Sequence, residues 1–263
     1  MPIKQTIEKG VRAIMQRLGI QQTMASVPPL TLPEFQNRMS GHVYTLYLNY
    51  SFLIKGGVYT VAAQSLLHLP QADHSKVEHV SVRFLFWFVS FLFSLITIST
   101  WSRGSAMTNA KAGSLDVILP IGIAIPEYLL FIILDPTTSG TGRWYWWYLF
   151  AALHAAFGLS IVLYRKSLTK LESDYDEDMR PLAILYVNWM RADQFGASVG
   201  VGLNLAFFLI TYFWSWLASS GAEWVHWVVG LVLVVIGFKI TSDAYAQYQE
   251  MATYEPPQNA PAA

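Results

Sequence analysis

The chain contains no cysteine, which excludes disulfide bonds, thiolate-bound iron–sulfur clusters and catalysis by a cysteine nucleophile. Charged residues are also scarce, at 13% of the 263 residues, against about 25% in soluble domains. Basic and acidic residues balance to a net charge of zero, so no overall positive field favours nucleic acid. These deficits point away from a soluble domain and from a nucleic-acid partner.

Catalytic motifs are sparse. The sequence has no HExxH zinc motif and no phosphate-binding loop of the Walker type. It also lacks the paired histidine and aspartate clusters that a membrane metalloenzyme needs. We therefore assign no catalytic residue and no metal site, predict no cofactor, and lean against an enzyme without excluding one.

What the chain has in abundance is apolar sequence, since 54% of its residues are hydrophobic and 15% are aromatic. A membrane-spanning helix needs about 20 predominantly apolar residues. A first stretch, residues 43–67, is weakened by Asn49, Lys55 and Gln64. Five further stretches qualify: 82–101, 115–135, 144–164, 199–217 and 224–239. The sequence thus predicts an all-α, polytopic bundle of six transmembrane helices.

The distribution of lysine and arginine supports six spans. Cytoplasmic loops of membrane proteins collect these residues. With six spans, one side of the membrane holds 12 of them and the other side holds only Lys76 and Arg143. Without a span at 43–67 this bias largely disappears. We therefore expect an integral protein of the cell (inner) membrane with a cytoplasmic N-terminus, surrounded by lipid.

The pattern divides the chain into three parts. Residues 1–41 form a cytoplasmic segment whose start has the spacing of a basic amphipathic helix, typical of the membrane interface. Residues 42–246 form the bundle and include a cytoplasmic loop at 165–198, and residues 247–263 form a disordered tail. Within that loop, 181–196 is interpreted as an interfacial helix beginning at Pro181. A seventh span there is the alternative.

Aromatic clusters mark several of the expected span ends. Tryptophan and tyrosine gather at 143–148, 214–216 and 223–227. Such clusters are typical of the belt that lies in the headgroup region. A tryptophan-lined ligand site is the alternative.

Charged residues inside the expected spans are the candidates for function, because ionisable groups are costly at that depth. The candidates for an ion, proton or solute site are Glu127, Lys55, Lys239, Asp116 and Asp243. We expect Pro120 and Pro126 to interrupt the helix of Glu127 and to free carbonyl groups beside it. Two alternatives are a structural ion pair of Glu127 with Lys55 or Lys239, and a neutral, protonated Glu127.

His154 lies in the middle of a span, among alanines and a glycine that allow another helix to approach closely. We interpret it as a packing histidine with a hydrogen bond. An axial ligand of a b-type haem is the alternative, although His79 and His226 lie near span ends and match its depth poorly.

The spacing of Asp116 and Glu127, with a lysine in the last span, resembles microbial rhodopsins over two helices. The resemblance implies a retinal on Lys239, with Asp116 as counterion and Glu127 as proton donor. The sequence departs from the family at Val117, where the family has tryptophan, and at Val235, where it has an acid. We do not assign the chain to this family.

Three functions remain open at this point. The first is a channel or transporter component for an ion or small solute, carried by Glu127. The second is a non-catalytic subunit that anchors or scaffolds a larger complex, with a homo-oligomer or other membrane subunits as partners. The third is a retinal- or other pigment-binding protein, with Lys239 or His154 as the attachment point.

Overall fold

The computed structural model describes residues 28–40, 42–72, 79–107, 114–139 and 144–256. Within these ranges the chain is helical, and one isolated β-bridge joins Leu30 to Tyr175. The amphipathic helix predicted at the start of the chain and the last seven residues of the predicted tail lie outside the described residues.

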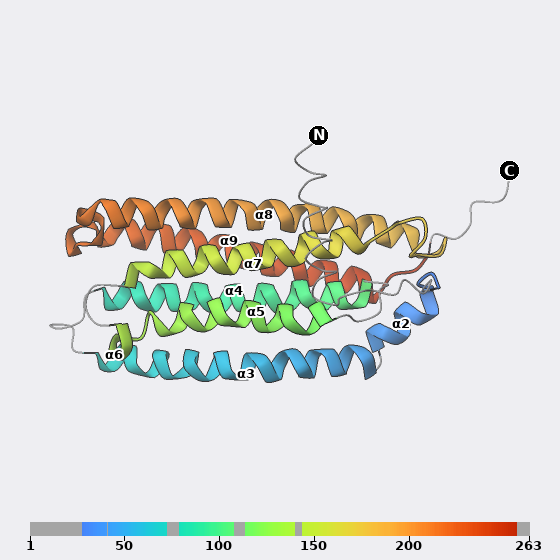
Figure 1. Ribbon diagram of the computed structural model, residues 1–263, viewed down its shortest axis with the longest axis horizontal. Coiled ribbons are helices and arrows are strands. Elements are labelled where there is room, and N and C mark those ends of the chain that lie inside the picture. Colours follow the sequence, from blue (N-terminus) through green and yellow to red (C-terminus); the bar gives the residue numbers. More distant parts are fainter. Residues whose placement is uncertain (1–27, 41, 73–78, 108–113, 140–143, 257–263) are drawn as a thin grey trace.

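Long helices run side by side and give the molecule an elongated shape (Figure 1). They are α3 (His42–Gln71), α4 (Val80–Met107), α5 (Ser114–Ile132), α7 (Trp147–Leu168), α8 (Arg180–Phe213) and α9 (Glu223–Ala252). Shorter elements join them: α2 (Leu32–Ser40), α6 (Pro136–Ser139), η1 (Trp144–Trp146), η2 (Ser215–Ala218) and η3 (Ser220–Ala222). The helix α9 includes residues 247–252, so the predicted disordered tail begins too early.

Four of these helices are long and apolar enough to cross a membrane: Val80–Met107, Trp144–Ser167, Arg180–Phe213 and Glu223–Ala252. The described apolar part of α5, Ile121–Ile132, is shorter. The weak first stretch does form a helix, α3, with 30 residues. Its crossing of the membrane stays a prediction.

The predicted cytoplasmic loop at 165–198 is mostly helical. The helix α7 continues to Leu168 and α8 begins at Arg180, with Pro181 in its first turn. Proline is tolerated there because its missing N–H has no helical partner at that position. The interfacial helix expected at 181–196 is therefore the first half of α8. With 34 residues, α8 is about 51 Å long, so this polar half can extend beyond an apolar layer of about 30 Å.

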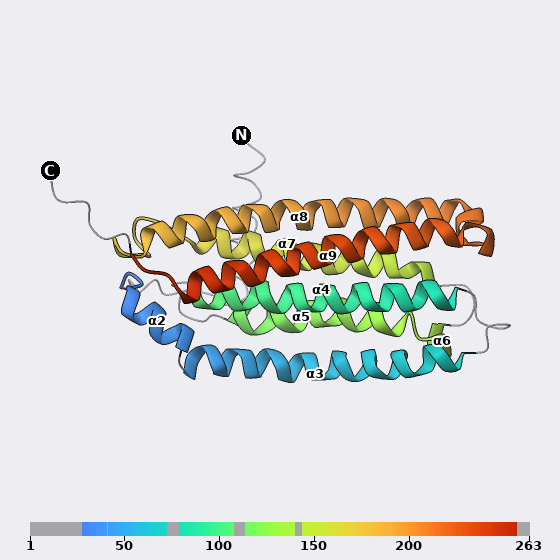
Figure 2. The ribbon, with the colours of Figure 1, turned by 180° about the vertical axis from the view of Figure 1, so that it is seen from behind.

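The helices α4 and α9 pack closely, and α9 comes to the front when the bundle is viewed from behind (Figure 2). Gly230 and Gly237 of α9 face Leu85 and Leu92 of α4. A Cβ atom at Gly230 would overlap the side chain of Leu85, so this approach requires glycine. On the other side of the bundle α8 packs against α7, and α5 lies between α7 and α3.

The aromatic cluster at 143–148 does not form an interfacial belt. Trp144, Trp147 and Tyr148 are at most 1% exposed, and the Trp147 ring stacks on Phe86 at a centroid distance of 4.5 Å. Aromatic burial of this kind contributes to the core. Trp214, Trp216 and Trp224 lie at the same end of the bundle as Trp144 and are exposed, as a belt requires. We call this end of the bundle the Trp144 end. The opposite end, with α2 and the start of α8, is called the Arg103 end.

Candidate functional site

Glu127 lies inside the bundle, with 0% of its surface exposed. It sits on α5 directly after Pro126, which cannot donate the backbone hydrogen bond to the residue four positions earlier. The expected interruption does not occur, because α5 runs unbroken from Ser114 to Ile132. The helix thus carries a carboxylate into an apolar interior, where it must be paired or neutral.

Lys55 supplies the pairing. It lies on α3, is 4% exposed, and its Nζ donates to both carboxylate oxygens of Glu127. The same Nζ lies 3.3 Å from the hydroxyl oxygen of Ser94 on α4. Of the two lysines considered as partners from sequence, Lys55 is therefore the one that pairs with Glu127.

His154 of α7 completes the cluster. Its Nε2 is 3.1 Å from Oε1 of Glu127 and 3.0 Å from Oγ1 of Thr97. Because the Thr97 hydroxyl donates to the carbonyl of Phe93 at 2.9 Å, it accepts from His154, and Nε2 carries the proton in this arrangement. The ring also stacks on Phe93, 5.9 Å between centroids. Sequence reasoning missed this partnership, although the matching mid-span depth of Glu127 and His154 was a signal for it.

The hydrogen bonds join into one chain. The Ser94 hydroxyl donates to the Tyr59 hydroxyl at 3.2 Å, extending the cluster beyond Lys55. We call the six residues the buried polar chain: Tyr59, Ser94, Lys55, Glu127, His154 and Thr97. Four helices, α3, α4, α5 and α7, contribute to it.

The electrostatics of this chain depend on one proton. Lys55 and Glu127 cancel as cation and anion, so the cluster is neutral when the His154 imidazole is neutral and carries one positive charge when it is protonated. In a medium of low dielectric constant such a change is large. An imidazole hydrogen-bonded to a carboxylate is an arrangement that can pass a proton between two groups.

The remaining sequence candidates lie apart from this cluster. Lys239 and Asp243 form an ion pair on α9, with side chains 73% and 51% exposed. Asp116 belongs to α5, and its side chain lies outside the described part of the chain. The proposed pairing of Lys239 with Glu127 is wrong, and the lysine does not face the interior where a retinal would lie against Glu127.

Ser198 lies in a GxSxG pattern, at 196–200, that resembles a hydrolase nucleophile motif. That motif requires a strand-to-helix turn, whereas these residues lie within α8. The Ser198 hydroxyl donates to the carbonyl of Gln194, one turn earlier. The pattern is therefore ordinary helix sequence.

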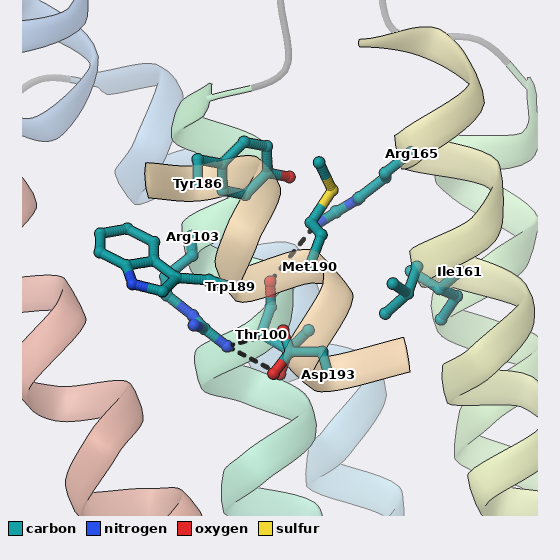
Figure 3. Close-up of a pocket in the computed structure, with 9 residues that line it drawn as sticks. Thr100, Arg103, Ile161, Arg165, Tyr186, Trp189, Met190 and Asp193 are labelled. Atoms are coloured by element: carbon teal, nitrogen blue, oxygen red, sulfur yellow. Dashed lines mark hydrogen bonds and ion pairs between the residues drawn. The ribbon is translucent and has the colours of Figure 1, made fainter. Parts of the chain in front are cut away.

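A second polar group lies at the Arg103 end, around a small cavity between α4, α7 and α8 (Figure 3). Nη2 of Arg103 is 3.1 Å from the Asp193 carboxylate and 3.3 Å from the Thr100 hydroxyl. Arg165 donates to the carbonyls of Thr100 and Trp101 at 3.3 and 3.2 Å, and its guanidinium lies 4.4 Å from the Trp101 ring. Asp193 is one of the polar residues that argued against a membrane span at 181–196. In the structure it forms an ion pair with Arg103 inside the bundle.

At the Trp144 end, Asp135 follows α5 in the turn before α6, outside the helices that could cross a membrane. It is 5% exposed. Its carboxylate accepts hydrogen bonds from the Thr137 hydroxyl at 2.7 Å and lies 2.8 Å from the His68 ring. Burial raises the pKa of Asp135, and the hydrogen bonds from Thr137 and His68 more than offset this, so the pKa lies below its ordinary value.

Comparison with protein-family models, with curated proteins and with solved structures found no match.

Proposed function

We propose that the protein moves protons across a membrane, as a channel or a transporter component, and that the buried polar chain carries them. The observation behind this proposal is the hydrogen-bonded series Lys55–Glu127–His154 in the interior of the bundle. A buried ion pair adds little net stability to a fold, because the loss of hydration of the two charges offsets their attraction. Ionisable groups kept at such depth are therefore candidates for transport.

The geometry favours a proton over a larger solute. The members of the buried polar chain contact one another directly, and a proton needs only hydrogen bonds to move. When His154 carries a proton on both nitrogens, the proton on Nε2 can pass to Oε1 of Glu127 across 3.1 Å. This breaks one N–H bond, forms one O–H bond and leaves a neutral imidazole protonated on Nδ1. Nε2 is then free to accept the next proton from the Thr97 side.

The proposal includes a membrane topology. The six spans are α3, α4, α5, α7, α8 and α9, with the N-terminus in the cytoplasm of the cell. What supports it is the length of these helices, their parallel arrangement, and the 12 basic residues that six spans assign to the cytoplasmic side. The exposed apolar side chains of α8 and α9 are those expected to face lipid.

One of the observations behind the scaffold hypothesis is weakened, namely the small residues around His154 as a contact surface for a partner. Ala151 and Ala152 are buried, and Ala155 faces Gly200 of α8, whose added Cβ would lie 3.4 Å away. This part of the surface is occupied by the protein's own helices, whereas Gly158 has nothing within 4 Å of an added Cβ.

The test is proton flux into liposomes loaded with a pH-sensitive dye, driven by a potassium gradient and valinomycin. The variant Glu127→Gln removes the carboxylate, and we expect flux to fall at least tenfold toward that of empty liposomes. The matched control is Asp243→Asn, the same chemical change on the exposed α9 pair, which should conduct like the wild type. If Glu127→Gln does not fold, the variant Lys55→Met/Glu127→Gln removes the pair without leaving an unpaired charge. Wild-type flux in either folded variant would refute the proposal.

A further inference from the structure

The cavity at the Arg103 end lies next to the buried polar chain. Thr100 lines the cavity, and Thr97, which bonds His154, precedes it by three residues on α4. Residues at this spacing lie on the same face of a helix. One helical turn therefore separates the cavity from the last member of the chain.

The cavity has the size and the polar lining of a water site. Its volume of about 10 Å³ suits about one water molecule, which also needs polar partners. Arg103 lines the cavity and is 4% exposed. Its Nε is buried and has no hydrogen-bond partner among the described residues. A donor of this kind requires an acceptor, and a water molecule provides one.

Charge determines what such a water can do. Two guanidinium groups, Arg103 and Arg165, line the cavity, and Asp193 contributes the one carboxylate among its lining residues. Positive charge in a narrow passage repels protons. Asp193 pairs with Arg103 at 3.1 Å and removes part of that barrier.

We propose that this cavity holds a water molecule through which protons enter the buried polar chain from the Arg103 end, and that Asp193 keeps the entry open by neutralising Arg103. The proposal rests on the proposed function of proton transfer. The step balances once Nε2 of His154 has given its proton to Glu127. The Thr97 hydroxyl turns from the Phe93 carbonyl and gives its proton to Nε2. The cavity water takes up a proton from the aqueous side and passes one on toward the Thr97 oxygen, one helical turn away, so the hydroxyl and the water are unchanged and the imidazole regains one proton.

The absence of cysteine allows a direct test of water access. In the full chain, Met190→Cys places a single thiol in the wall of the cavity. The control Ser90→Cys places one on α4 at a position with 0% exposure. A charged, membrane-impermeant methanethiosulfonate is added to one side of oriented proteoliposomes. We expect Met190→Cys to react from the Arg103 end at least tenfold faster than from the other side, and Ser90→Cys to react from neither.

Flux measurements test the role of the lining residues. Thr100→Val keeps the shape of the side chain but removes its hydroxyl, and Asp193→Asn removes the neutralising charge. We expect each to slow proton flux at least fivefold. Ser99→Ala is the matched control, because the Ser99 hydroxyl bonds only carbonyls of its own helix among the described residues, at Leu95 and Ile96.

The results separate this inference from the proposed function. A conducting wild type with unchanged flux in both Thr100→Val and Asp193→Asn overturns the entry route and leaves proton transfer in place. A wild type that does not conduct overturns the proposed function, and with it this entry route, even where Met190→Cys reacts. Asymmetric labelling together with slowed flux supports both.

Discussion

Replacing Lys55 by methionine should destabilise the protein strongly, and the cost should depend on pH. The change removes the cation that contacts both oxygens of Glu127 and leaves a carboxylate with 0% exposure. Removing one partner of a buried ion pair costs about 3–5 kcal/mol. We expect a loss of this size in the free energy of unfolding at pH 8.

Lower pH should reduce this cost. In Lys55→Met the cluster regains neutrality when it takes up one proton, on Glu127 or on His154, 3.1 Å away. The folded variant then binds one proton more than the unfolded chain, so its stability rises as pH falls, by up to about 1.4 kcal/mol per pH unit. In the wild type Lys55 already compensates the Glu127 carboxylate, so the rise should be smaller than in Lys55→Met.

The assay is reversible unfolding in detergent, followed by tryptophan fluorescence, for wild type, Lys55→Met, Glu127→Gln and the double variant. Because the double variant leaves no unpaired charge, the two single costs should exceed the cost of the double variant by at least about 2 kcal/mol. Additive costs, or a pH-independent loss below about 1 kcal/mol in Lys55→Met, would refute a dry, buried pair.

Three further outcomes follow from the structure. The pKa of Asp135 is lowered in the folded protein, so its ionised carboxylate stabilises the fold at pH values above its ordinary pKa. This contribution is lost as pH falls through the lowered value. Asp135→Asn should therefore flatten the fall in melting temperature below about pH 4. Gly230→Ala should lower the free energy of unfolding by about 1–3 kcal/mol because the added Cβ overlaps Leu85. Gly202→Ala, whose added Cβ has nothing within 4 Å, should stabilise the helix by up to about 1 kcal/mol. Equal melting temperatures of the two variants would contradict this packing. Lys239→Met removes an exposed pair and should change stability by less than about 1 kcal/mol in the same unfolding assay, with proton flux unchanged.

The helical architecture could be predicted from sequence because hydrophobic length is a local property. The segment 181–196 was interpreted as separate from the next span because Asp193 and Gln194 look too polar for the interior when counted alone. In the structure Asp193 accepts a hydrogen bond from Arg103 of α4, and Gln194 accepts one from Lys166 of α7. A window along the chain cannot include those distant partners.

The candidate site was predictable in part for the same reason. Glu127 and Lys55 stood out because charges are rare in apolar stretches. The choice of Lys55 over Lys239, and the place of His154, depend on which helices are neighbours, and this is set by the packing of α3, α5 and α7. The expectation that Pro126 interrupts α5 was wrong because a proline within a packed helix can be accommodated without ending it.

The separation of Lys55 and Glu127 along the chain has a consequence for biosynthesis. Lys55 precedes its partner by 72 residues, which a ribosome takes about 4 to 14 seconds to add. With the proposed six spans, α3 carries an uncompensated cation during that interval and lacks a stable place in lipid. The helix should therefore remain beside the insertion machinery until α5 emerges, and the two should enter the membrane together.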